Sequence, residues 1–338
     1  MICNWGILGP GSITTGALIP AIQRSRNGRV RAIASRDQAR AQTVAAQWDI
    51  ERAYGDYQAL LADPGIDAVY IALPNSLHSI WTIHAARAGK HVLCEKPLAC
   101  SAREGAAMLD ACQEAGVQLM EAAMYRFHPR MLRLKQLLAE GALGSPRFLH
   151  SAFSFPFNNP QNYRNFPAYG GGALLDVGCY CVNALCWLSG AAPVAIQTFT
   201  LYQEQGGIDL DTSALLRFAD GALGHIQCSF AAAEHQAIEI VGSVGTLTVP
   251  LAFTAWREDT TTLHLKQAGQ MKDEQFAPAD PYQLMVEHFV AVLQGEAALS
   301  YVPQDAIQTL EVLDGIRALA EVSSYTVTGN SIHSRGSG

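Results

Sequence analysis

Short apolar runs alternate with helical patterns along the first 120 residues, and few folds accommodate that order. The runs are rich in Val, Ile and Leu, as buried strands are, and they occupy residues 2–8, 30–34, 68–73, 91–94 and 117–120. Helices are predicted between them at residues 13–26, 38–48, 56–62, 77–88 and 102–115. Repeated strand–helix–strand units require parallel strands with right-handed crossovers. We therefore predict an α/β fold whose first domain, residues 1–122, is a doubly wound parallel sheet.

The pattern changes after about Tyr125. Side chains alternate in character along residues 213–218, and Asp220-Gly221 separates them from a second such run, which is a hairpin signal. Helices are predicted again at residues 282–293 and 304–322. We expect an α+β domain with an antiparallel sheet over residues 123–330, followed by a frayed polar tail at residues 331–338.

Composition and charge exclude several classes of protein. Hydrophobic residues make up 49% of the chain and charged ones 16%, so we expect a folded protein. The net charge of −7 gives no basic surface for nucleic acid or anionic membranes. Met1 leads directly into the first strand, and the eight cysteines form no C-x-x-C pair. We expect an unexported, cytoplasmic protein with free thiols.

A glycine-rich turn, Gly9-Pro10-Gly11-Ser12-Ile13, joins the first strand to the first helix. The first glycine permits a tight turn, and the second lets a pyrophosphate approach the N-H groups at the helix start. Thr14 stands where the dinucleotide fingerprint has Gly or Ala, so the fingerprint is incomplete. We predict a dinucleotide site, with a plain glycine turn as the alternative.

The second strand ends in Ser35 and Arg36, where NAD-binding proteins carry an acidic residue for the ribose hydroxyls. A hydroxyl and a guanidinium can instead hold a 2′-phosphate, which favours NADP and leaves NAD possible. The alternative is a solvated Arg36 with Asp37 capping the next helix.

Two segments follow later strands, and ligands of doubly wound sheets bind at such strand ends. They are Leu73-Pro74-Asn75-Ser76-Leu77-His78 and Glu95-Lys96-Pro97. Lys96 directly follows a buried strand, so its ammonium reaches the rim of the predicted nicotinamide crevice. There it can polarise a substrate oxygen or exchange its proton.

These segments and two later ones resemble the Gfo/Idh/MocA family of sugar and polyol oxidoreductases. The later segments are residues 121–129, E-A-A-M-Y-R-F-H-P, and residues 170–180, G-G-G-A-L-L-D-V-G-C-Y. The resemblance covers nearly the whole chain. It implies a Rossmann domain, an open antiparallel sheet that often forms homodimers, a catalytic Lys96 and a cis Lys96-Pro97 peptide. It also places Arg126 with the cofactor-binding residues.

Asp176 and Tyr180 lie four residues apart, on one face of an apolar helix. A carboxylate in such a helix is costly unless it meets a partner or lines a cavity. Many relatives have His at the second position, and Tyr resembles the branch of dihydrodiol dehydrogenase, NADP-dependent xylose dehydrogenase and glucose-fructose oxidoreductase. We interpret Tyr180 as the general acid/base, with Lys96 lowering the pKa of its phenol and Asp176 as a third catalytic residue. The alternative is a Tyr packed beneath the helix.

Asn162 and Arg164 precede the three glycines and resemble family positions close to the substrate, although solvated loop residues fit equally well. We expect substrate to contact Lys96, Asn162, Arg164, Asp176 and Tyr180. The histidines are scattered without ligand spacing, and Cys179, Cys181 and Cys186 do not share a helix face, so no metal site is predicted.

The leading hypothesis is an NADP-dependent dehydrogenase or reductase that moves hydride to or from a carbinol carbon of a sugar, polyol or cyclic diol. The alternative is a cofactor-binding sensor of the same fold without turnover, because fold alone does not decide function. The identity of the substrate and the direction of reaction stay open.

Overall fold

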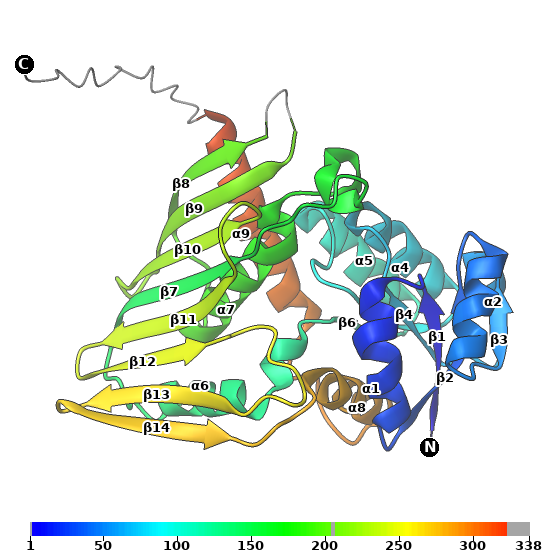
Figure 1. The fold of residues 1–338 in the computed structure, drawn as a ribbon, viewed down its shortest axis with the longest axis horizontal. Coiled ribbons are helices and arrows are strands. Elements are labelled where there is room, and N and C mark those ends of the chain that lie inside the picture. The colour runs from blue at the N-terminus through cyan, green and yellow to red at the C-terminus, as the bar shows by residue number, and fades with distance from the viewer. Residues whose placement is uncertain (1, 204–206, 323–338) are drawn as a thin grey trace, which may run out of the picture.

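A six-stranded parallel sheet forms the first half of the protein (Figure 1). The structure, a computed structural model, describes residues 2–203 and 207–322. The strand order is β3-β2-β1-β4-β5-β6, so β2 and β3 lie on one side of β1, and β4, β5 and β6 lie on the other. The strands are β1 (Cys3–Leu8), β2 (Gly28–Ala34), β3 (Arg52–Tyr54), β4 (Ala68–Ile71), β5 (His91–Cys94) and β6 (Leu119–Glu121). The predicted doubly wound sheet is confirmed, and it places the carboxyl ends of β1, β4 and β5 side by side.

The helices of this half follow the prediction except that the first is divided, and one strand was not predicted. They are α1 (Ile19–Arg24), α2 (Gln38–Gln47), α3 (Tyr57–Leu61), α4 (His78–Arg87) and α5 (Ala102–Glu114). The first predicted helix, 13–26, is divided: a π-helical turn at Thr14–Leu18 precedes α1, and Pro20, which lacks an N-H, stands in the first turn of the new helix. The sequence prediction missed β3, because its three half-buried residues form no apolar run.

The second sheet has eight strands in the order β14-β13-β12-β11-β7-β10-β9-β8. All neighbours pair antiparallel except β7 and β10. The predicted hairpin is confirmed, since Arg217 pairs with Leu223 across Asp220-Gly221. The strands are β7 (Pro146–Ser154), β8 (Ala195–Tyr202), β9 (Asp209–Arg217), β10 (Leu223–Ser229), β11 (His235–Gly242), β12 (Gly245–Pro250), β13 (Thr261–Gln267) and β14 (Gln270–Phe276).

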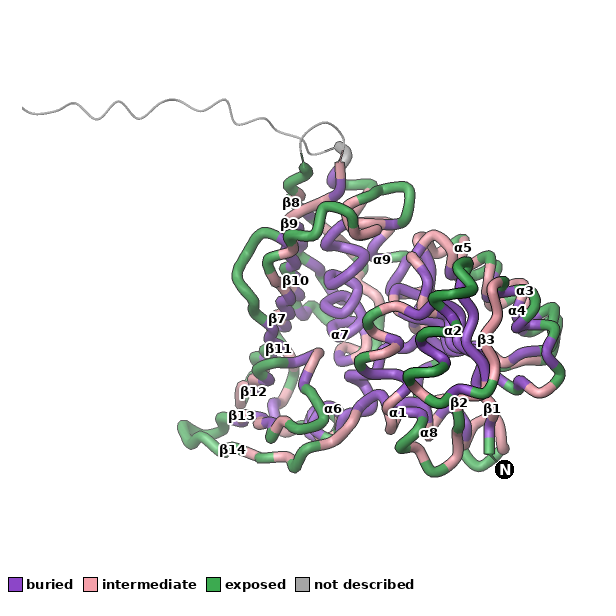
Figure 2. The backbone as a smooth tube through the Cα atoms, turned by 45° about the vertical axis from the view of Figure 1, so that its right-hand side comes forward, coloured by how far each residue is buried: buried purple, intermediate pink, exposed green. Residues whose placement is uncertain are grey.

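Helices cover one face of this sheet and leave the other face open. The covering helices are α6 (Pro129–Ala139), α7 (Cys179–Ser189) and the long α9 (Pro303–Val322), and α9 also packs on α5 of the first half (Figure 1). Residues 167–189 are long and apolar enough to cross a membrane, but 89% of the apolar 18-residue window within them is buried inside the fold. The buried course of α7 beneath the sheet identifies it as a core helix (Figure 2).

One helix of the C-terminal part, α8 (Pro281–Leu293), returns to the first half of the protein. The rings of Trp5 and Phe289 lie 5.7 Å apart, and Arg24 at the end of α1 pairs with Asp280 at the start of α8. The side chain of Arg26 also reaches Glu287, at 3.3 Å. The boundary between residues 122 and 123 stays a prediction, and the tail at 331–338 lies outside the described residues.

Candidate active site

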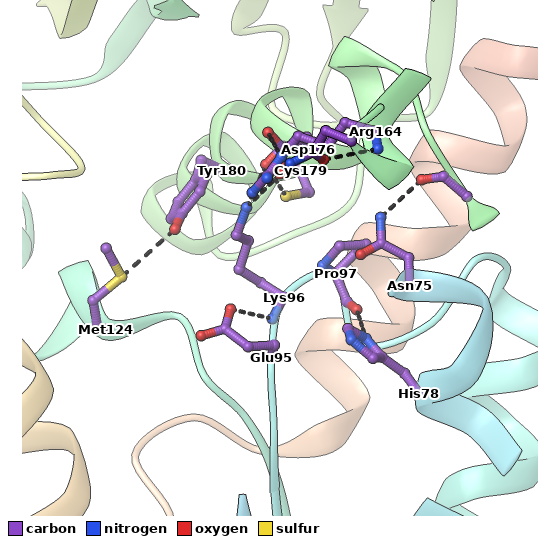
Figure 3. A network of polar contacts seen from close by, with 12 residues as sticks. Asn75, His78, Glu95, Lys96, Pro97, Met124, Arg164, Asp176, Cys179 and Tyr180 are labelled. Atoms are coloured by element: carbon purple, nitrogen blue, oxygen red, sulfur yellow. Dashed lines mark hydrogen bonds and ion pairs between the residues drawn. The ribbon is translucent and has the colours of Figure 1, made fainter. Parts of the chain in front are cut away.

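Lys96 extends from the end of β5 toward a continuous helical segment (Figure 3). In that segment Asp176 lies in a π-helical turn, Leu174–Gly178, and Tyr180 lies in α7, which follows directly. The Lys96 ammonium donates to the backbone oxygen of Asp176 at 2.7 Å and to the Oδ1 atom of the same residue at 3.1 Å. The Lys96-Pro97 peptide is cis, as the resemblance implied. The strand-end position thus delivers the lysine across the cleft to the second half of the protein.

Asp176 stands between two cations. Arg164 Nε donates to its Oδ2 atom at 2.8 Å, while Lys96 holds Oδ1. Burial alone would raise the pKa of the Asp176 carboxyl, but the charges of Lys96 and Arg164 outweigh burial and lower it. The same contact with Asp176 raises the pKa of Lys96 against the opposing effect of burial. The three side chains therefore form a charged triad in which a buried carboxylate is held between two partly buried cations.

Tyr180 lies beside this triad, with its ring beneath the lysine. The Lys96 Nζ atom is 4.8 Å from the ring centroid, and the phenol donates to Met124 Sδ, a weak acceptor, at 3.6 Å. Burial raises the pKa of the phenol well above its usual value, and the nearby Glu95 carboxyl adds to the rise. The expectation that Lys96 lowers this pKa is therefore wrong for this structure, because burial outweighs the effect of an ammonium that faces the ring and is paired with Asp176.

Three consecutive glycines allow three segments to meet just before Asp176. A Cβ atom on Gly170 would lie 2.9 Å from Asn75 Cβ, one on Gly171 2.4 Å from the Arg164 carbonyl oxygen, and one on Gly172 2.0 Å from Asp209 Oδ1. The Gly170 carbonyl accepts from Asn75 Nδ2 at 2.8 Å. The glycines thus let the start of the helix that carries Asp176 lie directly against the segment after β4, the Arg164 loop and the first residue of β9.

Asp209 anchors the start of this helix, accepting from the Leu174 N-H at 2.6 Å. Burial raises its pKa to about 6 from an ordinary 3.8. A raised folded pKa means that stability present below pH 4 is lost as the pH rises through about 6. We expect Asp209→Asn, which keeps an acceptor but cannot ionise, to gain about 2 kcal/mol of unfolding free energy at pH 8 and nothing at pH 4. Urea denaturation at both pH values measures this, and a loss at pH 8 would contradict it.

The glycine turn at the first strand has the shape that a pyrophosphate needs. A Cβ atom on Gly9 would lie 2.5 Å from the Ala72 carbonyl oxygen, whereas one on Gly11 would meet nothing closer than 4.0 Å. Thr14 is buried, and its hydroxyl donates to the Gly9 carbonyl at 2.8 Å. The threonine that departs from the fingerprint therefore braces the turn, and the space above Gly11 stays open.

Ser35 and Arg36 line the same cavity as the glycine turn, as predicted. Asp37 caps α2 by accepting from the N-H groups of Ala39 and Arg40. Arg40 lies in the first turn of α2, four residues after Arg36, and donates to the Pro10 carbonyl at 2.8 Å. Sequence reasoning missed Arg40, although a second arginine in the first turn of the helix that follows Arg36 was a usable signal.

One cavity of about 870 Å³ joins these parts. Of the predicted site residues it contains Gly9, Pro10, Gly11, Ser12, Ile13, Ser35, Arg36, Leu73, Pro74, Asn75, His78, Glu95, Lys96, Arg164, Asp176 and Tyr180. Its walls also include residues outside the predicted site set, namely Tyr57, Met124, Phe153, Phe155, Tyr163, Trp256 and Tyr282. Phe153, whose ring lies 5.5 Å from that of Tyr180, and the adjoining Phe155 give the Tyr180 end an apolar wall suited to the C-H face of a sugar or diol.

Two predicted site residues do not line the cavity. Arg126 is buried below it, with its guanidinium 3.9 Å from the Tyr301 ring centroid and 4.6 Å from that of Trp187. Asn162 caps a short turn by accepting from the Arg164 N-H at 3.1 Å. The prediction that Arg126 binds the cofactor is therefore wrong for this structure. Asn162 contacts the site only through the backbone of Arg164. Within residues 2–203 and 207–322, no group of three or more His, Cys, Asp or Glu side chains could hold a metal ion.

Comparison with known proteins agrees with this geometry. Residues 3–123 match the model of an oxidoreductase family with an NAD-binding Rossmann fold, and residues 131–248 match the GFO/IDH/MocA C-terminal domain. D-xylose 1-dehydrogenase (NADP(+)) 2 of Haloferax volcanii is 39% identical over 95% of this chain and 98% of its own. Trans-1,2-dihydrobenzene-1,2-diol dehydrogenase of Mus musculus is 35% identical over 68% and 69%.

Solved structures share the whole architecture. KijD10, a 3-ketoreductase from Actinomadura kijaniata crystallised with NADP and TDP-benzene, has a TM-score of 0.88 and 28% identity over 94% of this chain and 98% of its own. Aldose-aldose oxidoreductase from Caulobacter crescentus, complexed with glycerol, has a TM-score of 0.89 and 26% identity over 95% and 98%. With both domains matched and a full-length relative at 39% identity, this protein belongs to the Gfo/Idh/MocA family of oxidoreductases.

Proposed function

We propose that the protein is an NADP-dependent oxidoreductase that moves a hydride to or from a carbinol carbon of a sugar, polyol or cyclic diol. One observation carries this proposal: Lys96, Asp176 and Tyr180 meet in the same cavity as the glycine turn and Arg36. The relatives named above are an NADP-dependent D-xylose dehydrogenase, a dihydrobenzene diol dehydrogenase and a 3-ketoreductase crystallised with NADP, and they support this proposal. When bound, NADP supplies the hydride donor or acceptor at its nicotinamide ring.

In this proposal the chain's own residues bind the substrate oxygen and move its proton. The Tyr180 hydroxyl, which now rests on the weak acceptor Met124 Sδ, exchanges the proton of the reacting hydroxyl. The Lys96 ammonium holds the same oxygen. Asp176 keeps Lys96 and Arg164 oriented and ionised, and Arg164, with 27% of its side chain exposed, contacts a neighbouring hydroxyl.

The direct test is turnover. Purified protein with NADP⁺ and D-xylose, other aldoses or a dihydrodiol should develop the absorbance of reduced nicotinamide, and with NADPH and keto-sugars it should lose that absorbance. A sensor without turnover would bind the cofactor, as judged by its fluorescence, and change absorbance with none of these compounds.

Arg36 should decide the preference for NADP. We expect Arg36→Ala to raise the Kd of NADPH roughly 5- to 150-fold, the cost of one charge-assisted hydrogen bond, and to leave the Kd of NADH unchanged. Arg29→Ala, at the opposite end of β2, is the matched control. Equal losses for the two cofactors would contradict the role of Arg36.

The open face of the second sheet is proposed as a homodimer interface. The strand register places Phe148, Leu215 and Leu223 on this face, and Phe199 on the neighbouring β8 is 77% exposed. Such a patch needs a partner, and a symmetric pair covers it on both copies. Light scattering should give twice the chain mass, and Leu215→Lys should halve it. A monomeric mass for the unmodified protein at micromolar concentration would refute the dimer.

The cysteines support a reducing compartment. All eight are free in the structure, and all except Cys100 are buried, which suits the cytoplasm proposed from the sequence.

A further inference from the structure

A buried chain of hydrogen bonds lies beneath the Lys96 loop, outside the cavity, and ends on one carboxylate. Glu121, the last residue of β6, is 4% exposed. Its Oε1 atom accepts from the Leu98 N-H at 2.5 Å, and its Oε2 atom accepts from the Tyr301 hydroxyl. Leu98 stands two residues after Lys96, so Glu121 fixes the backbone from which the lysine extends.

The chain continues from Tyr301 into the helix of Tyr180. Asn183 Nδ2 donates to the Tyr301 oxygen at 2.8 Å, and Asn183 Oδ1 accepts from the Tyr125 hydroxyl at 2.5 Å. Asn183 lies three residues after Tyr180 on α7, and the rings of Tyr125 and Tyr180 are 5.8 Å apart, edge to face. Glu121 therefore connects the segment that carries Lys96 to the segment that carries Tyr180.

The hydrogen bonds that link Tyr125 to Glu121 all run in one direction, toward Glu121, and Asn183 Nδ2 also donates to Thr309 Oγ1 at 3.1 Å. Tyr125 donates to Asn183, Asn183 donates to Tyr301, and Tyr301 donates to Glu121, which receives Leu98 from its other side. Only an acceptor-only group can end a chain of this direction, and an ionised carboxylate is such a group. A glutamine would face one of its two donors with an N-H group and leave that donor without an acceptor.

Arg126 supplies a positive charge beside this carboxylate. Its guanidinium stacks on the Tyr301 ring at 3.9 Å, and its Nη2 atom lies 3.4 Å from Asp305. Burial raises the pKa of Glu121, while the bonds from Tyr301 and Leu98 and the charges of Arg126 and Lys96 oppose that rise. Arg126, which does not line the cavity, therefore helps to keep the Glu121 carboxylate ionised.

We propose that Glu121 is a positioning residue that holds the Lys96 loop and the Tyr180 helix at a fixed separation through Leu98, Tyr301 and Asn183. The proposal rests on the catalytic roles proposed for Lys96 and Tyr180. It predicts that loss of the chain displaces the lysine from the reacting oxygen, and a displacement of about 1 Å costs up to roughly 100-fold in rate.

The test compares Glu121→Gln and Tyr301→Phe with the unmodified enzyme. Both should lower kcat, by roughly 10- to 100-fold for Glu121→Gln and less for Tyr301→Phe, with KM and the Kd of NADPH within about threefold. Amide hydrogen exchange in residues 95–98 should become faster in Glu121→Gln. Should Glu121→Gln fail to fold, Tyr301→Phe, which loses a single hydroxyl, still decides the outcome.

Lys90→Met is the matched control. Lys90 precedes the opposite end of β5, is 7% exposed, and donates to the carbonyls of Asp63 and Ile66 at 2.8 Å. Its loss should lower the Tm and leave both kcat and exchange at residues 95–98 unchanged. If Lys90→Met lowers kcat as much as Tyr301→Phe does, general destabilisation explains the effect and positioning is refuted.

A double-mutant cycle separates the positioning role proposed for Glu121 from the catalytic role proposed for Lys96. In a Lys96→Met background, Glu121→Gln should change kcat by less than about threefold, because the lysine it positions is absent. If Lys96→Met alone leaves kcat unchanged, the catalytic role of Lys96 fails. If Lys96→Met lowers kcat and the two losses multiply, the catalytic role stands and Glu121 does not act through Lys96.

Discussion

Tyr180→Phe should lower kcat by roughly 10²- to 10⁴-fold, because the only change is loss of the hydroxyl proposed to exchange the substrate proton. The ring stays, with its contacts to Tyr125, Phe153 and Phe253, so folding and the Kd of NADPH should be nearly unchanged. Steady-state kinetics and fluorescence titration measure the two quantities. Near-normal kcat in Tyr180→Phe would remove Tyr180 from the mechanism.

Lys96→Met should produce a comparable loss of kcat, because the ammonium that holds the substrate oxygen is gone. If the residues act as one unit, the double variant should be little worse than the poorer single variant. Losses that multiply would mean that the two side chains work independently.

Asp176→Ala should be the most destabilising single change at the site. It leaves the partly buried Lys96 and Arg164 without their shared counter-ion, and breaking a buried ion pair in this way costs up to roughly 3 to 5 kcal/mol. Urea denaturation at pH 7 measures the loss. The triple variant Lys96→Met, Asp176→Leu, Arg164→Leu removes all three charges and should recover most of the stability. A triple variant as unstable as Asp176→Ala would show that packing dominates over charge.

The pH dependence of this loss has a defined sign. The folded pKa of Asp176 lies below its ordinary value of 3.8, so its contribution is present above pH 4 and disappears as the pH falls through the folded pKa. The raised pKa of Lys96 places the opposite limit above pH 10.5, where its contribution begins to fall. The difference between the unmodified protein and Asp176→Ala should therefore be flat from pH 5 to 9.

The first sheet could be predicted because each buried strand is a continuous apolar run, and periodicity needs no long-range information. The position of Lys96 followed from the same rule, since a residue after a parallel strand must reach the ligand edge. Arg126 shows the limit of that reasoning. Its place in the chain, just after β6, is close to the site, but the aromatic rings of Trp187 and Tyr301 hold its side chain below the cavity.

Other parts of the site could not be predicted because distant segments build them. Tyr282 reaches the cavity only because α8 returns to the first sheet, and Phe153 only because β7 runs at the centre of the second. The direction of the Tyr180 pKa shift was also beyond the sequence. It depends first on how deeply the phenol is buried and then on the nearby Glu95 carboxyl.

The return of α8 to the first sheet limits how the protein can be recombined with its relatives. The packing of Trp5 on Phe289 and the pairing of Arg24 with Asp280 join residues that lie more than 250 positions apart. A chimera with one junction near residue 123 would place one parent's α8 against the other parent's α1. The part of the protein that must be exchanged as one unit is therefore discontinuous in sequence. Functional chimeras should take residues 1–122 and 281–293 from the same parent.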